Sequence, residues 1–160
     1  MSANQSAIQQ SLTFTFTLNG AQVQAEAGQT ILEVARAKGV EIPTLCHHPA
    51  LEAYGGCRLC MVEIAQGRRK RLVTSCNYEV REGLEVQTDS ERVRKSRRMS
   101  LELFLSRCPE VESIRELAGK YGIQTPRFPL EKDDCILCGL CVRICRERMG
   151  PGVGDLLCVV

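Results

Sequence analysis

The sequence predicts an α+β fold in which a β-grasp sheet is followed by a small helical segment and a cysteine motif. Two observations support this fold class. Up to about residue 89, short runs with a period of two flank a single helical pattern. From Ser90 onward the period becomes that of a helix. The predicted parts are a flexible N-terminus (1–11), a β-grasp domain (12–89), a helical connector (90–122) and a linker with a cysteine motif (123–160).

The β-grasp domain begins with a predicted hairpin around Asn19-Gly20, a dipeptide that favours a two-residue turn. A capping box formed by Thr30 and Glu33 then opens a helix, and Gly39 ends it. Three further strands complete the sheet, because they continue the alternation of apolar and polar residues. The predicted elements are strands over 12–18 and 21–26, a helix over 30–37, and strands over 61–65, 71–76 and 84–87.

The second part begins with a long amphipathic helix, which Pro109 ends. Ser113 and Glu116 form another capping box, which predicts a shorter helix over 114–121, and residues 123–134 are expected to be an extended linker. The apolar face of the long helix contains Val93, Met99, Leu101, Leu103, Phe104 and Leu105. Its basic face contains Arg92, Arg94, Lys95, Arg97 and Arg98.

Composition limits the classes of function. The 160 residues include 21 basic and 19 acidic ones, so the net charge of +2 gives no reason to expect nucleic acid or a membrane surface as the main partner. We expect neither a secretory signal nor a membrane span, because no suitable apolar run is present. Ten cysteines in such a chain indicate a cytoplasmic location, and metal ligands in preference to disulfides.

Four cysteines form the first candidate ligand group: Cys46, Cys57, Cys60 and Cys76. Ten, two and fifteen residues separate them, and two glycines directly before Cys57 let the backbone approach a bulky inorganic group. Four thiolates suit an iron–sulfur cluster or zinc. Zinc would prefer two facing Cys-x-x-Cys knuckles, and Cys76 arrives alone. We therefore interpret the group as a [2Fe–2S] site, in which two ligands are close in sequence and the fold supplies the others.

This cysteine pattern resembles the [2Fe–2S] domain at the start of the large iron–sulfur subunit of respiratory complex I. It is similar also to the matching subunits of NAD-linked hydrogenases and formate dehydrogenases. The flanking sequences share the likeness: GQTILEVA at 28–35, IPTLC at 42–46 and CMVEI at 60–64. The resemblance covers roughly residues 12–149 and implies a β-grasp, ferredoxin-like domain that holds a [2Fe–2S] cluster.

A second group of cysteines has the spacing Cys-x2-Cys-x2-Cys-x3-Cys, the half-motif of bacterial [4Fe–4S] ferredoxins. We expect a [4Fe–4S] cluster here. Arg146 stands where that motif has proline, and no second such group follows to exchange ligands with it. The fourth ligand is open between Cys145, Cys158 and a cysteine of a partner, and the chain could also be a shortened form. The group consists of Cys135, Cys138, Cys141 and Cys145.

We assign no ligand role to the remaining cysteine before the second group, to the two histidines or to the basic run. Complex I relatives often have a further cluster site of one histidine and three cysteines, but this chain offers only Cys108 there, which we expect to be buried. His47 and His48 are expected to be surface or hydrogen-bonding side chains, because four cysteines are already present. The basic run 68–71 is expected at a solvated turn, with docking to an acidic subunit as the alternative. Positive charge beside the ligands, which would raise the reduction potential, comes from Arg58, Arg143 and Arg146.

The sequence contains no catalytic constellation that we recognise. It has no Walker loop, and no G-x-G-x-x-G follows a strand. We therefore expect a non-catalytic electron-transfer subunit. The resemblance implies a relay of single electrons between a flavin-containing, NAD(P)H-linked subunit and a catalytic subunit such as a hydrogenase or formate dehydrogenase. The alternative is a metal-stabilised interaction or assembly module without a redox role.

Overall fold

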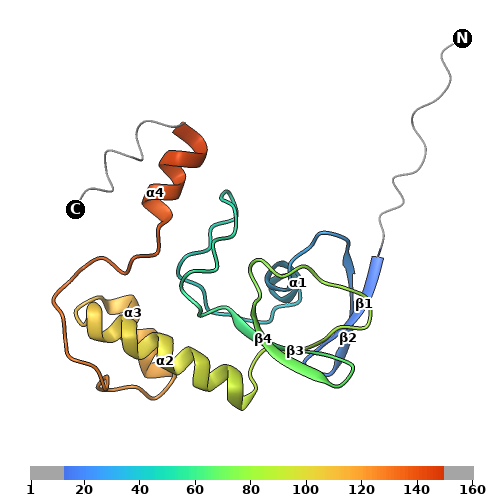
Figure 1. Ribbon diagram of the computed structural model, residues 1–160, viewed down its shortest axis with the longest axis horizontal. Coiled ribbons are helices and arrows are strands. Elements are labelled where there is room, and N and C mark those ends of the chain that lie inside the picture. Colours follow the sequence, from blue (N-terminus) through green and yellow to red (C-terminus); the bar gives the residue numbers. More distant parts are fainter. Residues whose placement is uncertain (1–12, 150–160) are drawn as a thin grey trace, which may run out of the picture.

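The computed structural model describes residues 13–149 and contains a mixed five-stranded sheet with one helix, α1 (Ile31–Ala37), beside it (Figure 1). The strand order is β2-β1-β5-β3-β4. Strands β1 and β5 are parallel, and the other neighbouring pairs are antiparallel. The predicted α+β class is confirmed. The strands are β1 (Thr13–Leu18), β2 (Ala21–Glu26), β3 (Met61–Gln66), β4 (Arg69–Thr74) and β5 (Glu85–Gln87).

The first hairpin and α1 form as their local sequences predict. Asn19 and Gly20 have φ of 51° and 87°, and positive φ at both positions is what a type I′ turn requires. Thr30 accepts a hydrogen bond from the Glu33 N–H through its side chain, and the Glu33 carboxylate accepts one from the Thr30 N–H at 2.7 Å. The resulting core between α1 and the sheet includes Phe16, Leu18, Ile31, Leu32, Ile64 and Val86.

Two predicted elements have boundaries that are wrong by one or two residues. Strand β4 begins at Arg69, two residues early, because Gly67 adopts a φ of 61° and closes a tight turn, so that Gln66 already pairs with Arg69. It ends at Thr74, which leaves Cys76 beyond the strand. Helix α3 (Glu112–Lys120) begins before the predicted cap at Ser113, because the carbonyl of Val111 already accepts the N–H groups of the first turn.

The helical connector packs against the loop of the first cysteine group. Helices α2 (Glu91–Arg107) and α3 form a helical hairpin beside the sheet (Figure 1). The segment 123–134 contains no helix or strand. It is attached to α2, because the Glu131 N–H donates to the Ser106 carbonyl at 2.7 Å and the Asp133 N–H to the Arg107 carbonyl at 3.2 Å. The boundary near residue 89 stays a prediction. The second core consists of Cys46, Cys57, Leu59, Leu101, Leu105, Ile114, Ala118 and Ile123.

The last described elements are the short helix α4 (Leu140–Ile144) and the π-helical turn η1 (Cys145–Met149). Within residues 13–149, none of the helices has the length and apolar character needed to cross a membrane.

Candidate functional site

The first cysteine group forms two buried pairs of thiols. The Sγ atoms of Cys60 and Cys76 are 3.4 Å apart. The Cys57 N–H donates to the Cys46 Sγ at 3.3 Å, and the two thiols are themselves hydrogen-bonded. The charges of Cys46, Cys57 and Cys60 all act on Cys76, so the two pairs lie close to each other. Each of the four side chains is at most 5% exposed.

Backbone hydrogen bonds position the sequence-distant pair. Cys60 lies directly before β3 and Cys76 lies two residues after β4, so the hairpin brings them to the same end. The Ser75 N–H donates to the Cys60 carbonyl at 3.0 Å, and the Leu32 N–H of α1 donates to the Ser75 carbonyl at 3.0 Å. The sheet and α1 therefore fix this pair independently of the loop that contains the other two thiols.

The glycine pair of that loop lies in a crowded, left-handed turn. Gly55 has a φ of 66°, and a Cβ there would lie 3.1 Å from the Asn77 side chain. A Cβ on Gly56 would lie 2.3 Å from the Tyr54 ring. Gly55 therefore suits this turn because it lacks a side chain at a positive φ, whereas a side chain at Gly56 would require the exposed Tyr54 ring to move.

The hydrogen bond within each pair of thiols lowers the pKa of one thiol and raises the pKa of the other. The Cys46 thiol lowers the pKa of Cys57 to about 5, and the Cys76 thiol lowers the pKa of Cys60 to about 7. The same hydrogen bonds, together with burial, raise the pKa of Cys46 and Cys76. One thiol of each pair is therefore prepared to act as a thiolate, and metal binding would release the proton of the other.

The arrangement fits a two-iron cluster. Two thiolates bound at about 2.3 Å to one tetrahedral metal are about 3.8 Å apart, close to the spacing of the Cys60 and Cys76 sulfurs. The buried Ser75 hydroxyl lies beside the Cys60 sulfur and, after the Cys76 thiol, helps to lower the pKa of Cys60. It meets no other hydrogen-bond partner in the described part of the chain, so it could donate to sulfur at this site.

No three His, Cys, Asp or Glu side chains within residues 13–149 converge on one metal position. A cluster that takes two thiolates on each of two irons does not require such a convergence. All nine cysteines of these residues are free thiols.

The second cysteine group is much more open to solvent. Cys135 and Cys141 are exposed, and Cys138 and Cys145 are half-buried. Cys141 lies in α4 and Cys145 begins η1, whereas the other two precede α4. The Cys135 carbonyl accepts a hydrogen bond from Arg107 at 3.0 Å, which attaches the segment to α2. Cys158 lies outside the described residues, so the ligand set of this group stays a prediction.

Arg143 connects the two cysteine groups. Its guanidinium donates to the carbonyl of Cys46 at 3.0 Å and to that of Glu52 at 2.9 Å, and it lies 5.3 Å from the centre of the Tyr54 ring. Arg148 donates to the Ala50 carbonyl at 2.6 Å. The segment of the second group therefore lies against the loop of the first, as the position of α4 in Figure 1 also shows. The sequence placed Arg143 beside the second group but not against the first.

The histidines form hydrogen bonds at the edge of the loop, as predicted. The His47 Nδ1 lies 3.3 Å from the Arg36 guanidinium, and burial, followed by the charge of Arg36, lowers the pKa of His47. The His48 Nδ1 accepts the Ala50 N–H at 3.1 Å.

Two other groups of side chains have the burial that we expected, and docking of the basic run to an acidic subunit stays an open alternative. Cys108 is fully buried, and burial raises its pKa. The basic run 68–71 is exposed at the turn and on β4, an edge strand, where charged side chains discourage pairing with other sheets.

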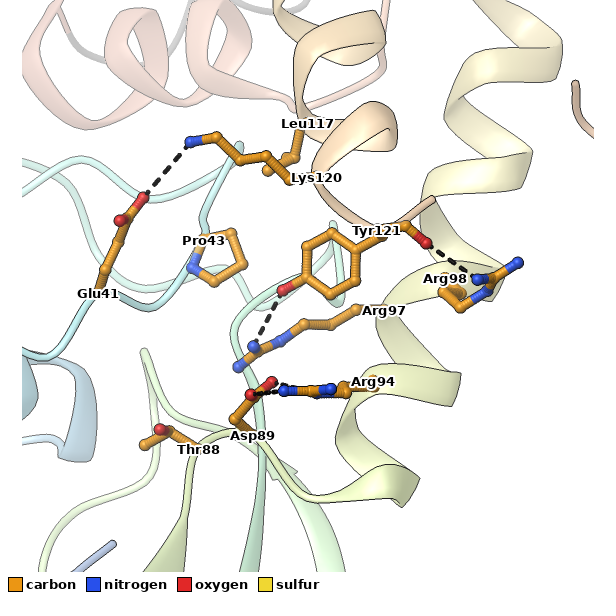
Figure 2. Close-up of a pocket in the computed structure, with 10 residues that line it drawn as sticks. All are labelled: Glu41, Pro43, Thr88, Asp89, Arg94, Arg97, Arg98, Leu117, Lys120 and Tyr121. Atoms are coloured by element: carbon orange, nitrogen blue, oxygen red, sulfur yellow. Dashed lines mark hydrogen bonds and ion pairs between the residues drawn. The ribbon is translucent and has the colours of Figure 1, made fainter. Parts of the chain in front are cut away.

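The sequence interpretation placed three side chains of α2 wrongly. Met99 and Leu103, expected on its apolar face, are 44% and 52% exposed. Arg97 is wrong in the opposite sense. We expected it on the solvated face of the long helix, but it is only 3% exposed. It donates to the Met61 carbonyl at 2.7 Å and to the Tyr121 hydroxyl at 3.1 Å (Figure 2). The spacing of Val93, Arg97 and Leu101 at intervals of four was the available signal, because it places Arg97 on the apolar stripe.

Comparison with known proteins decides the family. Residues 11–91 match the family described as "2Fe-2S iron-sulfur cluster binding domain". The chain belongs to this family of 2Fe–2S domains. The cysteine pattern resembled that of complex I and NAD-linked hydrogenase subunits, and relatives of both kinds confirm this resemblance.

Two curated relatives are respiratory subunits. The "NADH-ubiquinone oxidoreductase 78 kDa subunit, mitochondrial" of Candida albicans is 33% identical over 161 residues, which cover 84% of this chain and 22% of the relative. The "NADH-ubiquinone oxidoreductase 75 kDa subunit" of Reclinomonas americana is 31% identical over 165 residues, which cover 87% of this chain and 24% of the relative. The 2Fe–2S chain therefore spans less than a quarter of the length of these two proteins.

A solved structure supports the same fold. It is described as "Crystal structure of NAD+-reducing [NiFe]-hydrogenase in the H2-reduced state". One of its chains superposes with a TM-score of 0.71 at 34% identity, over 82% of this chain and 65% of that chain.

Proposed function

We propose that the protein is an iron–sulfur electron-transfer subunit. The observation that supports this most directly is the set of two buried thiol pairs in a chain of the 2Fe–2S domain family. The residues that would hold the cluster are Cys46, Cys57, Cys60 and Cys76. A bound [2Fe–2S] cluster supplies reversible one-electron chemistry, near about −400 mV in plant-type ferredoxins, a range suited to exchange with NAD(P)H.

The protein's own contribution is a dry and fixed environment. Leu59 and Val62, which lie beside the ligands in sequence, are fully buried. The Cys57 N–H already points at the Cys46 sulfur, so the loop holds a donor in place before any change of charge. Fixed dipoles and excluded water keep the reorganisation on electron transfer small.

We also propose a second electron-transfer centre, a [4Fe–4S] cluster. Its ligands would be Cys135, Cys138 and Cys141, with Cys145 as the fourth. The contact of Arg143 with the Cys46 carbonyl supports this proposal, because it gives a short hydrogen-bonded connection between the two groups. The exposure of Cys135 and Cys141 favours a position at the surface, where electrons could pass to a partner.

The partners are proposed from the relatives. Two of these are subunits of NADH-ubiquinone oxidoreductases, and a third belongs to an NAD+-reducing hydrogenase. We therefore propose that one partner is a flavin-containing, NAD(P)H-linked subunit and the other a catalytic oxidoreductase subunit, such as a hydrogenase or formate dehydrogenase. The cysteine-rich composition favours a reducing compartment, and we place the protein in the cytoplasm.

The test is the content of iron and acid-labile sulfide per chain after purification without oxygen, with EPR spectra before and after reduction. We expect about two irons from the first group and about six if the second cluster also forms. Cys60→Ser should remove the [2Fe–2S] signal. Cys108→Ser, an equally buried control, should retain it. Bound zinc, or iron that cannot be reversibly reduced, would contradict the proposal and favour the metal-stabilised interaction module.

A further inference from the structure

Arg97 is a buried cation without a bound carboxylate. It is 3% exposed, and its helical neighbours Val93 and Leu101 are fully buried. None of the ion pairs within residues 13–149 includes Arg97. A charge of this kind costs free energy to bury, so its retention in the core calls for a function.

The hydrogen bonds of Arg97 lead to the first cysteine group. One Nη donates to the carbonyl of Met61, the residue that directly follows Cys60, at 2.7 Å. The other Nη donates to the Tyr121 hydroxyl at 3.1 Å, and the buried Nε has no partner in the described part of the chain. These acceptors are neutral, so the positive charge is held in place without being cancelled.

The nearby acidic group is already occupied. Asp89 receives two hydrogen bonds from Arg94, which are the main cause of its lowered pKa, and the charge of Arg97 adds a smaller effect. Figure 2 shows Asp89 facing Arg94, whereas the guanidinium of Arg97 reaches the Tyr121 hydroxyl. The Asp89 carboxylate is therefore bound by Arg94 and acts on Arg97 only through a weaker charge interaction.

The other cations of this cavity, which has a volume of about 550 Å³, are also engaged. Arg98 donates to the Tyr121 carbonyl at 2.9 Å, and Lys120 lies 3.9 Å from the Glu41 carboxylate. Arg97 differs from both because it is buried and donates to the carbonyl of Met61, next to Cys60.

We propose that Arg97 raises the reduction potential of the cluster at Cys46, Cys57, Cys60 and Cys76. The inference rests on the proposed function. Arg97 is not a ligand, and it acts through its fixed charge beside the Met61 carbonyl, next to Cys60. In the proposed step, the oxidised cluster accepts one electron from the NAD(P)H-linked partner. Its charge becomes more negative by one unit, and no bond forms or breaks. A fixed positive charge stabilises the reduced form. Because the charge is buried, dissolved salt screens it weakly.

The test is a redox titration of the full chain, with the [2Fe–2S] EPR signal as the readout. Arg97→Gln should decrease the equilibrium constant for one-electron reduction on the order of tenfold, which is a shift to a more negative midpoint potential. Arg97→Lys keeps the charge and should stay near the wild type. Arg98→Gln removes an exposed charge of the same helix and should have little effect. The difference between Arg97→Gln and wild type should persist in high salt.

A second variant covers the case in which Arg97→Gln loses its cluster. Tyr121→Glu keeps Arg97 and places a carboxylate beside its guanidinium, which should also make the potential more negative. An unchanged potential in a cluster-loaded Arg97→Gln or Tyr121→Glu protein would overturn the inference. So would equal shifts for Arg97→Gln and Arg98→Gln. A wild-type chain that assembles no [2Fe–2S] cluster would instead overturn the proposed function.

Discussion

Glu63 and Glu102 are buried carboxylates, and each is bound by an arginine whose side chain remains largely exposed. Arg92 lies 2.7 Å from Glu63, and Arg127 lies 2.6 Å from Glu102. This arrangement keeps the acid paired while the long basic side chain retains contact with water. Arg97 has the reverse arrangement, a buried cation with neutral partners, and one of these partners is the carbonyl of Met61, the residue after Cys60.

Glu63→Gln should destabilise the protein by about 1 kcal/mol. The Ser90 hydroxyl, followed by Arg92, lowers the pKa of Glu63. A carboxyl group with a lowered folded pKa adds stability that is fully present above its unfolded pKa of about 4.3 and is lost as the pH falls through the folded pKa. Urea unfolding should therefore give the same decrease in the free energy of unfolding, Glu63→Gln relative to wild type, at pH 7.5 and at pH 5.5.

The control for this measurement is Glu41→Gln, because Glu41 is highly exposed and its ion pair with Lys120 is long, at 3.9 Å. It should change stability by less than about 0.5 kcal/mol. A Glu63→Gln effect that disappears between pH 7.5 and pH 5.5 would contradict the lowered pKa.

At the scale of elements, α1 is a short helix on which the ligand pair depends. It has seven residues, and its Leu32 N–H binds the Ser75 carbonyl next to Cys76. An isolated helix of this length is not stable in water, so it needs both its cap and its packing on the sheet. A weakened cap would therefore also loosen the Cys60 and Cys76 pair.

Thr30→Ala should cost about 1 kcal/mol of stability, because it removes the side chain that accepts the Glu33 N–H. Ser113→Ala is the matched control: the sequence places Ser113 in a similar capping box, but α3 starts earlier and has no side-chain cap. Its effect should stay within about 0.5 kcal/mol. Thermal unfolding followed by circular dichroism measures both, and equal losses would show that the Thr30 cap contributes nothing specific.

At the scale of the whole molecule, the chain returns twice to the loop of the first cysteine group. Leu101 and Ile114 of the helical connector pack against Cys46, Cys57 and Leu59 in the second core. The final described segment then contacts the outer part of the same loop through Arg143. The loop that supplies two of the candidate ligands is thus held from both sides by later parts of the chain.

Arg143→Gln should release this outer contact. Amide hydrogen exchange should become faster, on the order of tenfold, in residues 46–56 and 139–149, because a charge-assisted hydrogen bond contributes about 1.5 kcal/mol or more. Exchange in β1 and β2 should not change. Arg146→Gln removes an exposed arginine from the same segment and should leave both regions as they are. Unchanged exchange in Arg143→Gln would mean that the α4 segment does not stabilise the loop.

The sequence by itself determined the features that depend on neighbours along the chain. The Asn19-Gly20 turn, the Thr30 capping box and the alternation in β1 were all predictable, because turn geometry and side-chain period are local properties. The spacing of the first four cysteines was also sufficient to indicate the family, since a cluster needs its ligands in a recognisable order.

Only the tertiary structure decided which groups meet through space. Cys60 and Cys76 become a pair because the β3–β4 hairpin brings them to the same end of the sheet. No local sequence pattern predicts the distance between their sulfurs. Arg97 is buried because the Met61 carbonyl and the Tyr121 hydroxyl, which are distant in sequence, converge on its guanidinium. Arg143 reaches Cys46 across 97 residues for the same reason. Burial and long-range contacts depend on how elements pack, and helical or strand periodicity alone does not specify that packing.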